Sequence, residues 1–413
     1  MKGFLFRYRY QILLVFIGIV WISLLNEILQ IKNQNVIYSD SDNYRESADF
    51  LYHNFKAHYY RPLGMAAITG LPYLFGGDDT SVYNFSLVIN VIAWLASALL
   101  LFSFLKKSLS DKMAFAFSLI FYSALGPLFT NFHLLTESLF TFIMLLSFYF
   151  IDRYYSRRSF YFLSLSISIL LFAILIKPGA KLFCILIMLY FSRKLLKNVL
   201  NRSAILIYVT MSLIIFQCLM VRQEYGDFTL SYIDGVTYYN YLGNRAKLLN
   251  TNEEFVQANA RARYMLSLPF PLQKETAVND AVEQLKNNKI NLIKAYLLNL
   301  ADNTKSPSDC INVCKNLNGT SYFETAKNLM SIISKYQNRF FTVLGSFLAL
   351  YCCFRTRRRP DIYTLMSLFI LCNIAVSGIS CQQGDRFHIV FFPFAILLIG
   401  KTYADKTKKH IPE

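Results

Sequence analysis

The segment Ile12–Ile31, ILLVFIGIVWISLLNEILQI, is a run of mostly apolar residues whose only charged side chain is Glu27. A helix of about 20 apolar residues is as long as the hydrocarbon core of a bilayer is thick. The run ends without the small residues, in an A-x-A pattern, that follow the apolar part of a cleavable signal peptide. We therefore predict that this segment is a membrane span that stays in the protein.

Similar apolar runs recur along the whole chain. They lie at about 10–31, 82–105, 113–131, 135–151, 160–176, 179–192, 203–221, 338–354, 362–380 and 387–402. Only 16% of the residues are charged, against roughly 25% in soluble domains, and 55% are hydrophobic. We therefore predict an all-α polytopic integral membrane protein with about ten transmembrane helices.

The net charge of +17 comes from basic residues in short segments between alternate apolar runs. These segments contain 21 Lys and Arg residues against five acidic ones, and they are 1–9, 106–112, 152–159, 193–202, 355–361 and 401–413. The positive-inside rule assigns such segments to the cytoplasm. We expect a multi-pass protein of the cell inner membrane, with both termini cytoplasmic. The charge pattern does not indicate nucleic-acid binding, because the basic residues do not gather on one soluble domain.

This topology leaves a first outer loop, residues 32–81, between the first two spans. Its semi-apolar stretch Pro62–Phe75 has about 14 residues, which is too short to cross a bilayer. We predict that this stretch is an interfacial or re-entrant helix. The chain then divides into an N-terminal transmembrane module (1–221), an extracytoplasmic helical insert (222–335) and C-terminal transmembrane helices with a cytoplasmic tail (336–413).

The insert contains two patterns that predict helices, Asn252–Leu266 and Glu275–Leu300. In the second, Ala281, Leu285, Ile293 and Leu297 recur on one stripe, as apolar residues do along a helix. Two of the eight cysteines, Cys310 and Cys314, also lie in the insert. A spacing of four on a regular helix suits a disulfide poorly, so the sequence leaves their pairing open.

The first outer loop contains the acids Asp40 and Asp42. Asn43 and Glu46 fit a capping box, so we expect a helix to begin at Asn43, with both acids just ahead of it. Asp40 and Tyr44 are four residues apart and would share a face. Asp42 fits a capping role and a catalytic role equally well, whereas the position of Asp40 next to the first span favours function.

Glu137 stands at the predicted outer start of the fourth span. An ionisable group that enters the hydrocarbon region is costly, so it normally faces a polar cavity or a partner. The alternative is an interfacial acid that reaches out to water. His133, four residues earlier, is a candidate metal ligand or hydrogen-bond donor.

Arg61, Lys177, Lys181 and Arg386 all lie on the predicted outer side. Each alone could be a headgroup anchor, but together they place positive charge beside carboxylates at the membrane boundary. Such an arrangement suits the phosphate of an anionic lipid. The sequence has no Gly-rich phosphate loop, no Cys/His metal spacing and no G-x-S-x-G motif.

Taken in order, these motifs resemble those of the GT-C superfamily of membrane glycosyltransferases. The similar branch contains the protein O-mannosyltransferases and the aminoarabinose transferase of lipid A. The matching features are Asp40-x-x-x-Tyr44-x-x-x-Ala48, Arg61-Pro62, Thr136-Glu137, Lys177-Pro178 and Arg386 followed by Pro393. Many relatives have Asp-Glu where this chain has Ser-Asp-Ser-Asp, so the choice between Asp40 and Asp42 and the dependence on metal stay open.

The resemblance implies a hexosyl- or pentosyltransferase of surface-polysaccharide, lipid or protein glycosylation. Its donor would be a sugar on a polyprenyl phosphate, and its acceptor a hydroxyl of a glycan, lipid or protein, with inversion at the anomeric carbon. Asp40 or Asp42 would be the general base, with a pKa raised by desolvation.

The resemblance assigns the other residues to the phosphate and the acceptor. Lys177 and Arg386 would stabilise the leaving phosphate, and Tyr44, Arg61 and Lys181 would bind substrate. Glu137 would orient the acceptor or help to hold a divalent metal ion. Asp40 and His133 are the other candidate metal ligands, and no further cofactor is expected.

Two other functions fit part of the sequence. An O-antigen-type polymerase or ligase also combines many spans with a large outer loop, and it would depend on Arg386 rather than on Asp40. A lipid-linked sugar flippase or another transporter would need ionisable residues deep within several spans. The apolar runs are nearly free of charge, which disfavours the transporter.

Overall fold

The computed structural model describes residues 7–30, 39–251, 253–256, 259–356 and 360–408. In this part of the chain every regular element is a helix and no strand occurs. The predicted all-helical class is therefore confirmed.

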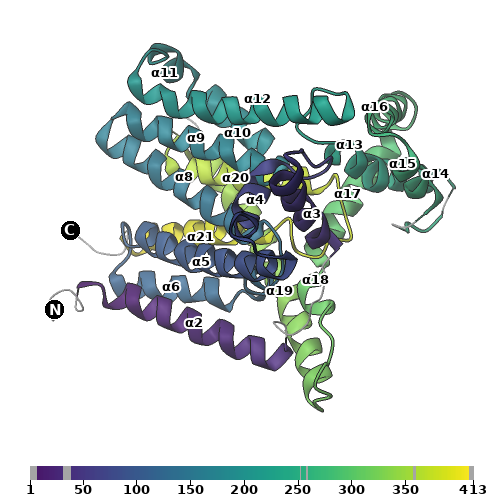
Figure 1. Ribbon diagram of the computed structural model, residues 1–413. Coiled ribbons are helices and arrows are strands. Elements are labelled where there is room, and N and C mark those ends of the chain that lie inside the picture. Colours follow the sequence, from purple (N-terminus) through teal and green to yellow (C-terminus); the bar gives the residue numbers. More distant parts are fainter. Residues whose placement is uncertain (1–6, 31–38, 252, 257–258, 357–359, 409–413) are drawn as a thin grey trace.

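Each predicted apolar run lies on a helix or a broken helix. The long helices are α2 (Arg9–Leu29), α5 (Asp79–Leu105), α6 (Asp111–Ser123), α8 (Glu137–Arg157), α9 (Phe160–Ile176), α10 (Lys181–Tyr190), α12 (Ile205–Tyr225), α19 (Phe323–Thr356), α20 (Ile362–Ser377) and α21 (Phe392–Lys408). Short connecting helices are α7 (Leu125–Phe129), η3 (Thr130–Phe132), η4 (Pro178–Ala180), α11 (Ser192–Lys197), η5 (Arg202–Ala204) and η7 (Ile389–Phe391). In Figure 1, α2, α5, α6, α8, α9 and α12 run side by side as a bundle.

Several of these helices could span a membrane. Within the described residues, three helical segments are long and apolar enough by themselves: α2, α5 and Arg202–Tyr225. The pair Asp111–Ser123 and Leu125–Phe132, bent by 65°, would make a fourth. Large apolar side chains on the outer faces of the bundle are exposed, among them Phe16, Val209 and Phe347. Exposed faces of this kind are typical of helices in contact with lipid. The total of about ten spans stays a prediction.

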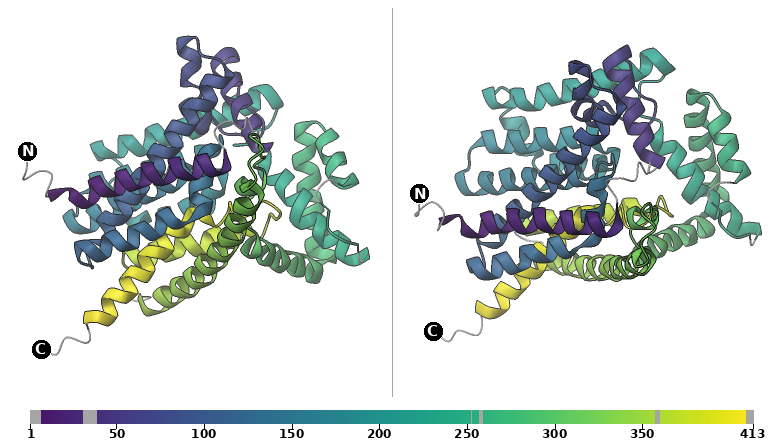
Figure 2. Two further views of the ribbon diagram at one scale, coloured as in Figure 1. Left: turned by 90° about the horizontal axis from the view of Figure 1, so that it is seen from below. Right: turned by 60° about the horizontal axis from the view of Figure 1, so that its bottom comes forward.

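The predicted cytoplasmic segments gather at one end of the bundle. Lys107, after α5, forms an ion pair with Asp152 of α8, and Arg355 of α19 lies 3.5 Å from Asp405 of α21. The start of α2 and the end of α21 also lie at this end, whereas the insert helices α14 to α17 (residues 244–305) lie at the opposite end (Figures 1 and 2). The bundle thus separates the basic segments from the insert. Its orientation in a membrane stays a prediction.

The first outer loop folds into α3 (Ser39–Asn54), α4 (Leu63–Thr69) and η2 (Leu71–Phe75). The prediction that a capping box at Asn43 begins the helix is wrong, because Asp40 and Asp42 lie in the first turn of α3. Acids in a first turn are favoured by the helix dipole, so the helix can include them. The stretch Pro62–Phe75 forms two short helices, of which α4 is largely buried.

The insert is built from short helices that pack on one another. They are α13 (Ile233–Thr237), the π-helix η6 (Tyr238–Gly243), α14 (Asn244–Thr251), α15 (Ala260–Ser267), α16 (Phe270–Asn287), α17 (Lys289–Lys305) and α18 (Asp309–Asn312). In the predicted helix Asn252–Leu266, residues 253–256 are not helical and α15 begins only after Asn259, whose side chain accepts from the Ala262 N–H; residues 252, 257 and 258 lie outside the described part of the chain. The predicted helix Glu275–Leu300 is divided at Asn288 into α16 and α17.

The apolar stripe of the second pattern is not the face that packs, because Leu285, Ile293 and Leu297 are each more than half exposed. Apart from Ala277 and Ala295, the residues that the two helices bury are polar, and they include Asp280 and Gln284 on α16 and Asn299 and Asn303 on α17. The helical period predicts the helices, whereas the face that packs is mainly polar.

The boundary at residue 335 does not coincide with the end of a helix. α19 begins at Phe323 and runs without a break into the bundle. Cys310 and Cys314 are buried free thiols, and the Cys314 thiol donates to the carbonyl oxygen of Cys310 at 3.2 Å. The two cysteines therefore do not form a disulfide in this structure.

Helix α4 lies against α9 with no space at Gly64. A methyl group there would come within 2.7 Å of the backbone carbonyl of Leu175. Gly179 is a matched control, because its nearest neighbour, Val376 Cγ1, would be 4.0 Å away. We predict that Gly64→Ala lowers the free energy of unfolding by about 1–3 kcal/mol, as overpacking does. Gly179→Ala should change it far less. Thermal unfolding in detergent measures both, and equal values would contradict the packing described.

Candidate functional site

A cavity of about 350 Å³ lies where the first outer loop, the bundle and the insert meet. Among its lining residues are Asp40, Tyr44, Arg61, Glu137, Lys177, Lys181 and Arg386, together with Asp234 and Thr237 of the insert. The structure therefore brings together seven of the residues singled out from the sequence. They come from segments as far apart as residues 40 and 386.

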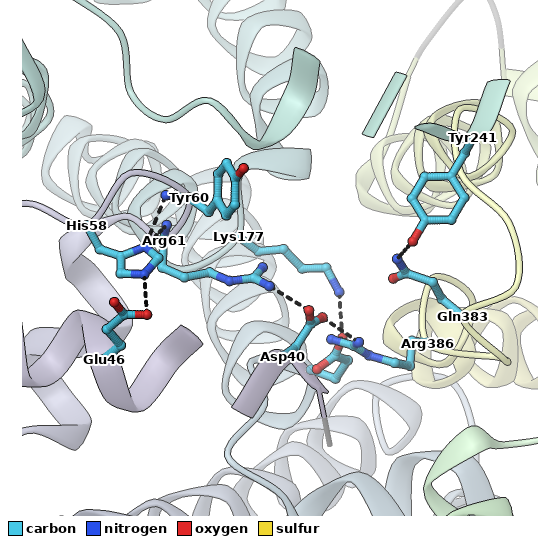
Figure 3. Close-up of polar contacts among 10 residues, drawn as sticks. Asp40, Glu46, His58, Tyr60, Arg61, Lys177, Tyr241, Gln383 and Arg386 are labelled. Atoms are coloured by element: carbon cyan, nitrogen blue, oxygen red, sulfur yellow. Dashed lines mark hydrogen bonds and ion pairs between the residues drawn. The ribbon is translucent and has the colours of Figure 1, made fainter. Parts of the chain in front are cut away.

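Five of these side chains form a row of alternating charge, which we call the charge ladder: Arg61, Asp40, Arg386, Glu137 and Lys177. Figure 3 labels Arg61, Asp40, Arg386 and Lys177. Arg61 Nη2 lies 2.6 Å from Asp40 Oδ1, and Arg386 Nη1 lies 2.7 Å from Asp40 Oδ2. On its other side, Arg386 donates from Nε and Nη2 to Glu137 Oε1, each at 3.0 Å. Lys177 Nζ donates to the same oxygen at 3.0 Å. Arg386 is thus the centre of the ladder.

Local structure explains how each member reaches the cavity. Asp40 lies in the first turn of α3, and Glu137 is the first residue of α8, positions where a helix dipole favours an acid. Lys177 directly follows α9, where Pro178 prevents the helix from continuing. The Arg61 guanidinium lies 4.6 Å from the centre of the Tyr44 ring, so Tyr44 holds it by a cation–π contact.

The ladder lies largely out of water. The side chains of Glu137 and Arg386 are 2% and 7% exposed. Removing charges from water costs several kcal/mol per ion, and the attraction of a buried pair often only offsets that cost. The stability that these ion pairs give the fold therefore does not explain why five charged side chains lie together. The binding of a charged ligand would explain it.

The pKa of Asp40 moves opposite to the expectation from the sequence. Burial alone would raise it, but Arg61 and Arg386 outweigh burial and hold the pKa of Asp40 well below its usual range. The expectation of a raised pKa is therefore wrong for this structure. The sequence could not show that both oxygens of the carboxylate are bound by guanidinium groups. Asp40 can act as a base only when these cations move away from it.

His58 supports the ladder and was not singled out from the sequence. Its Nδ1 accepts from the backbone N–H groups of Tyr60 and Arg61, at 3.0 and 3.1 Å, and its Nε2 lies 3.3 Å from Glu46 Oε2 (Figure 3). Burial and the charge of Arg61 lower the pKa of His58 to about 3. The ring is therefore neutral, and it fixes the backbone that carries Arg61. A histidine in a polar loop gives no sequence signal for this role.

Asp385, next to Arg386, was also missed. It is buried, and neither of its carboxylate oxygens has a hydrogen-bond partner among the described residues. Burial, followed by the charge of Asp309, raises the pKa of Asp385 to about 8. The acid in Gln382-Gln-Gly-Asp385-Arg386 resembles an ordinary turn residue, so only the fold reveals its burial.

Two candidate site residues lie outside the cavity. Asp42 is exposed, and its Oδ1 accepts from the Tyr83 hydroxyl at 3.3 Å. His133 is buried, and its carbonyl oxygen accepts from the Asn90 amide. Among the described residues, no three His, Cys, Asp or Glu side chains gather as metal ligands would. Asp40 and Glu137 instead share Arg386.

Comparisons of the chain with protein-family models, with curated proteins and with solved structures find no significant match. The resemblance to the GT-C superfamily therefore rests on the ordered motifs alone.

The pKa of Asp385 predicts a pH-dependent stability. Because the pKa in the folded protein, about 8, exceeds the usual 3.8, the proton on Asp385 stabilises the fold. This stabilisation is complete below about pH 4, declines as the pH rises, and is gone above about pH 8. Asp385→Asn keeps the shape without the ionisation. We expect its unfolding temperature to exceed that of the wild type by a margin that grows from about pH 5 to about pH 8 and then levels off. A margin that does not change with pH would contradict this.

Proposed function

We propose that the protein is a glycosyltransferase that moves a sugar from a polyprenyl-phosphate donor to an acceptor hydroxyl at the extracytoplasmic membrane face, with inversion. The observation that carries the proposal is the charge ladder, in which a carboxylate and three cations line one cavity at the end of a bundle of apolar helices. A sugar transfer from a lipid phosphate needs both a base and a site for the leaving phosphate.

The charge of the ladder supports a phosphate ligand. Its three cations exceed its two carboxylates by one positive charge. A sugar on a polyprenyl phosphate is a phosphodiester with one negative charge, which would make the site neutral. Arginine binds phosphate through two parallel N–H groups, and Nε and Nη2 of Arg386 both lie 3.0 Å from one oxygen of Glu137, Oε1.

The walls of the cavity suit a lipid-linked sugar and a separate acceptor. Phe140, Leu182 and Val376 line one part of it, and Leu182 is exposed on the outer face of α10. This part could receive the first isoprene unit of a lipid. Asp234 and Thr237 of the insert line another part. We assign the acceptor to the wall that the insert provides.

The proposed reaction is a direct displacement. An acceptor hydroxyl oxygen forms a bond to the anomeric carbon while the bond from that carbon to the phosphate oxygen breaks. The hydroxyl proton passes to Asp40, and the charge that develops on the leaving phosphate is stabilised by Arg386 and Lys177. Glu137 holds both cations in place before the donor enters.

Entry of the donor would also prepare the base. A phosphate competes with Asp40 for Arg61 and Arg386. As the guanidinium groups turn to the phosphate, burial becomes the main influence on Asp40 and its pKa rises. The carboxylate would thus become basic only when a donor is bound.

An O-antigen-type polymerase or ligase remains the second candidate, because Arg386 is the most connected residue of the ladder. Such an enzyme would need Arg386 but not the carboxylate of Asp40. Loss of Arg386 alone does not separate the two functions, since it also removes a partner of Asp40. The deciding variant is therefore Asp40→Asn.

We predict that Asp40→Asn abolishes transfer while insertion and abundance stay unchanged, because the amide cannot accept the proton. Removal of a general base typically costs about 10²–10⁴-fold in rate. Asp42→Asn is the matched control, because this acid lies two residues away on α3 and outside the cavity. The assay incubates purified protein and acceptor-containing membranes with radiolabelled polyprenyl-phosphate sugars and follows release of label from the lipid.

Full transfer by Asp40→Asn, with loss in Arg386→Ala, would favour the polymerase or ligase. Equal loss in Asp40→Asn and Asp42→Asn would remove the special role given to Asp40.

A further inference from the structure

The loop Ser380–His388, which carries Arg386, is held at both ends by one pair of buried asparagines. At its beginning, the Asn303 side chain donates to the carbonyl oxygens of Ser377 and Ser380, at 2.8 and 2.9 Å. Asn303 lies on α17, so this support comes from the insert.

The other asparagine holds the end of the loop. Asn338 of α19 places its Oδ1 3.2 Å from His388 Nδ1, and His388 Nε2 lies 3.2 Å from Ser377 Oγ. Asn338 also donates from Nδ2 to the carbonyl oxygen of Asn303 at 2.7 Å. The contacts thus form a closed ring that runs from Asn303 through the loop to His388 and back through Asn338.

Every member of this ring is buried. Asn303, Asn338, Ser380 and His388 are each at most 1% exposed. Buried polar side chains are costly unless they are hydrogen-bonded, and a bonded network specifies one arrangement. The ring therefore fixes where the loop between its two ends can lie.

We propose that Asn303 and Asn338 form a clamp that positions Arg386 between Asp40 and Glu137. Neither asparagine lines the cavity, so both are positioning residues that act through the loop. A second contact supports this function of the insert, because Gln383 in the same loop donates from Nε2 to the Tyr241 hydroxyl of η6 at 3.1 Å (Figure 3). The insert would thus hold the central cation as well as line the cavity.

A simpler alternative is that the asparagines only satisfy carbonyl groups at the end of α20. The chain offers a control for this alternative. Asn299 lies one turn before Asn303 on α17, is equally buried, and donates to the carbonyl oxygen of Gly378 at 2.9 Å. It binds the end of α20 and accepts from Arg245 Nη1, but it makes no hydrogen bond to Ser380 or His388. Because Asn303 also binds the end of α20, the comparison of the two variants isolates the hydrogen bond from Asn303 to Ser380.

The native Cys381 reports directly on the loop. It lies between the two held ends and is fully buried. We expect Asn303→Ala in the purified protein to increase the rate of Cys381 labelling by N-ethylmaleimide about tenfold, since Ser380 at the beginning of the loop and Ser377 just before it each lose a hydrogen bond. Asn299→Ala should label within about twofold of the wild type. Mass spectrometry assigns the label to Cys381.

Equal labelling rates in the two variants would overturn the clamp. If Asn303→Ala does not accumulate, Asn338→Ala takes its place with the same control, because it removes the side chain that joins His388 Nδ1 to the backbone of Asn303 and leaves only Thr342 Oγ1, at 3.0 Å, on that nitrogen. Labelling of Cys381 in that variant at the wild-type rate would overturn the clamp as well.

A second measurement rests on the proposed function. A displaced Arg386 should slow the step in which charge develops on the phosphate, so Asn303→Ala should lower kcat about 100-fold, with KM for the donor changed less than about threefold. Asn299→Ala should leave both near the wild type. A fall in kcat that is the same in both variants would overturn the positioning role. If even the wild type transfers no sugar, the proposed function fails, while the labelling experiment still decides the clamp.

Discussion

The contact on which the site depends is that of one guanidinium with two carboxylates. Arg386 binds Asp40 through Nη1 and Glu137 through Nε and Nη2, and it is almost completely buried. Each carboxylate reaches this point on a different element, α3 or α8. A charge in this position holds the first outer loop against the bundle. To bind the same guanidinium, a lipid phosphate would have to draw Arg386 away from these two carboxylates.

Apolar length and charge pattern were enough to predict the helices of the bundle and the separation of the basic segments from the insert. The site was harder to predict, because the residues that meet in it are separated by up to 346 positions. Asp40, Glu137 and Arg386 were found because a charge beside an apolar run needs a partner. His58 and Asp385 were not found, because only burial distinguishes them from ordinary loop residues.

The insert shows where periodicity fails. The apolar stripe of its helices α16 and α17 is exposed, and the residues that the two helices bury are mainly aspartate, glutamine and asparagine. Gln284 donates to the carbonyl oxygen of Gly243 and Asn303 to that of Ser380, whereas Asp280 pairs with Lys247 and Arg261. Apolar spacing in a sequence cannot reveal partners of this kind. The contact of Asn303 with Ser380 connects the insert to the loop that carries Arg386.

The most direct test of this account is the binding of sugar-free polyprenyl phosphate to the purified protein. If phosphate and Asp40 compete for the same guanidinium groups, Asp40→Asn should bind the lipid more tightly than the wild type although it transfers no sugar. Arg386→Gln should bind it more weakly, since the bidentate donor is lost. An affinity that is unchanged or reduced in Asp40→Asn would contradict the account, because the carboxylate would then not compete with the ligand.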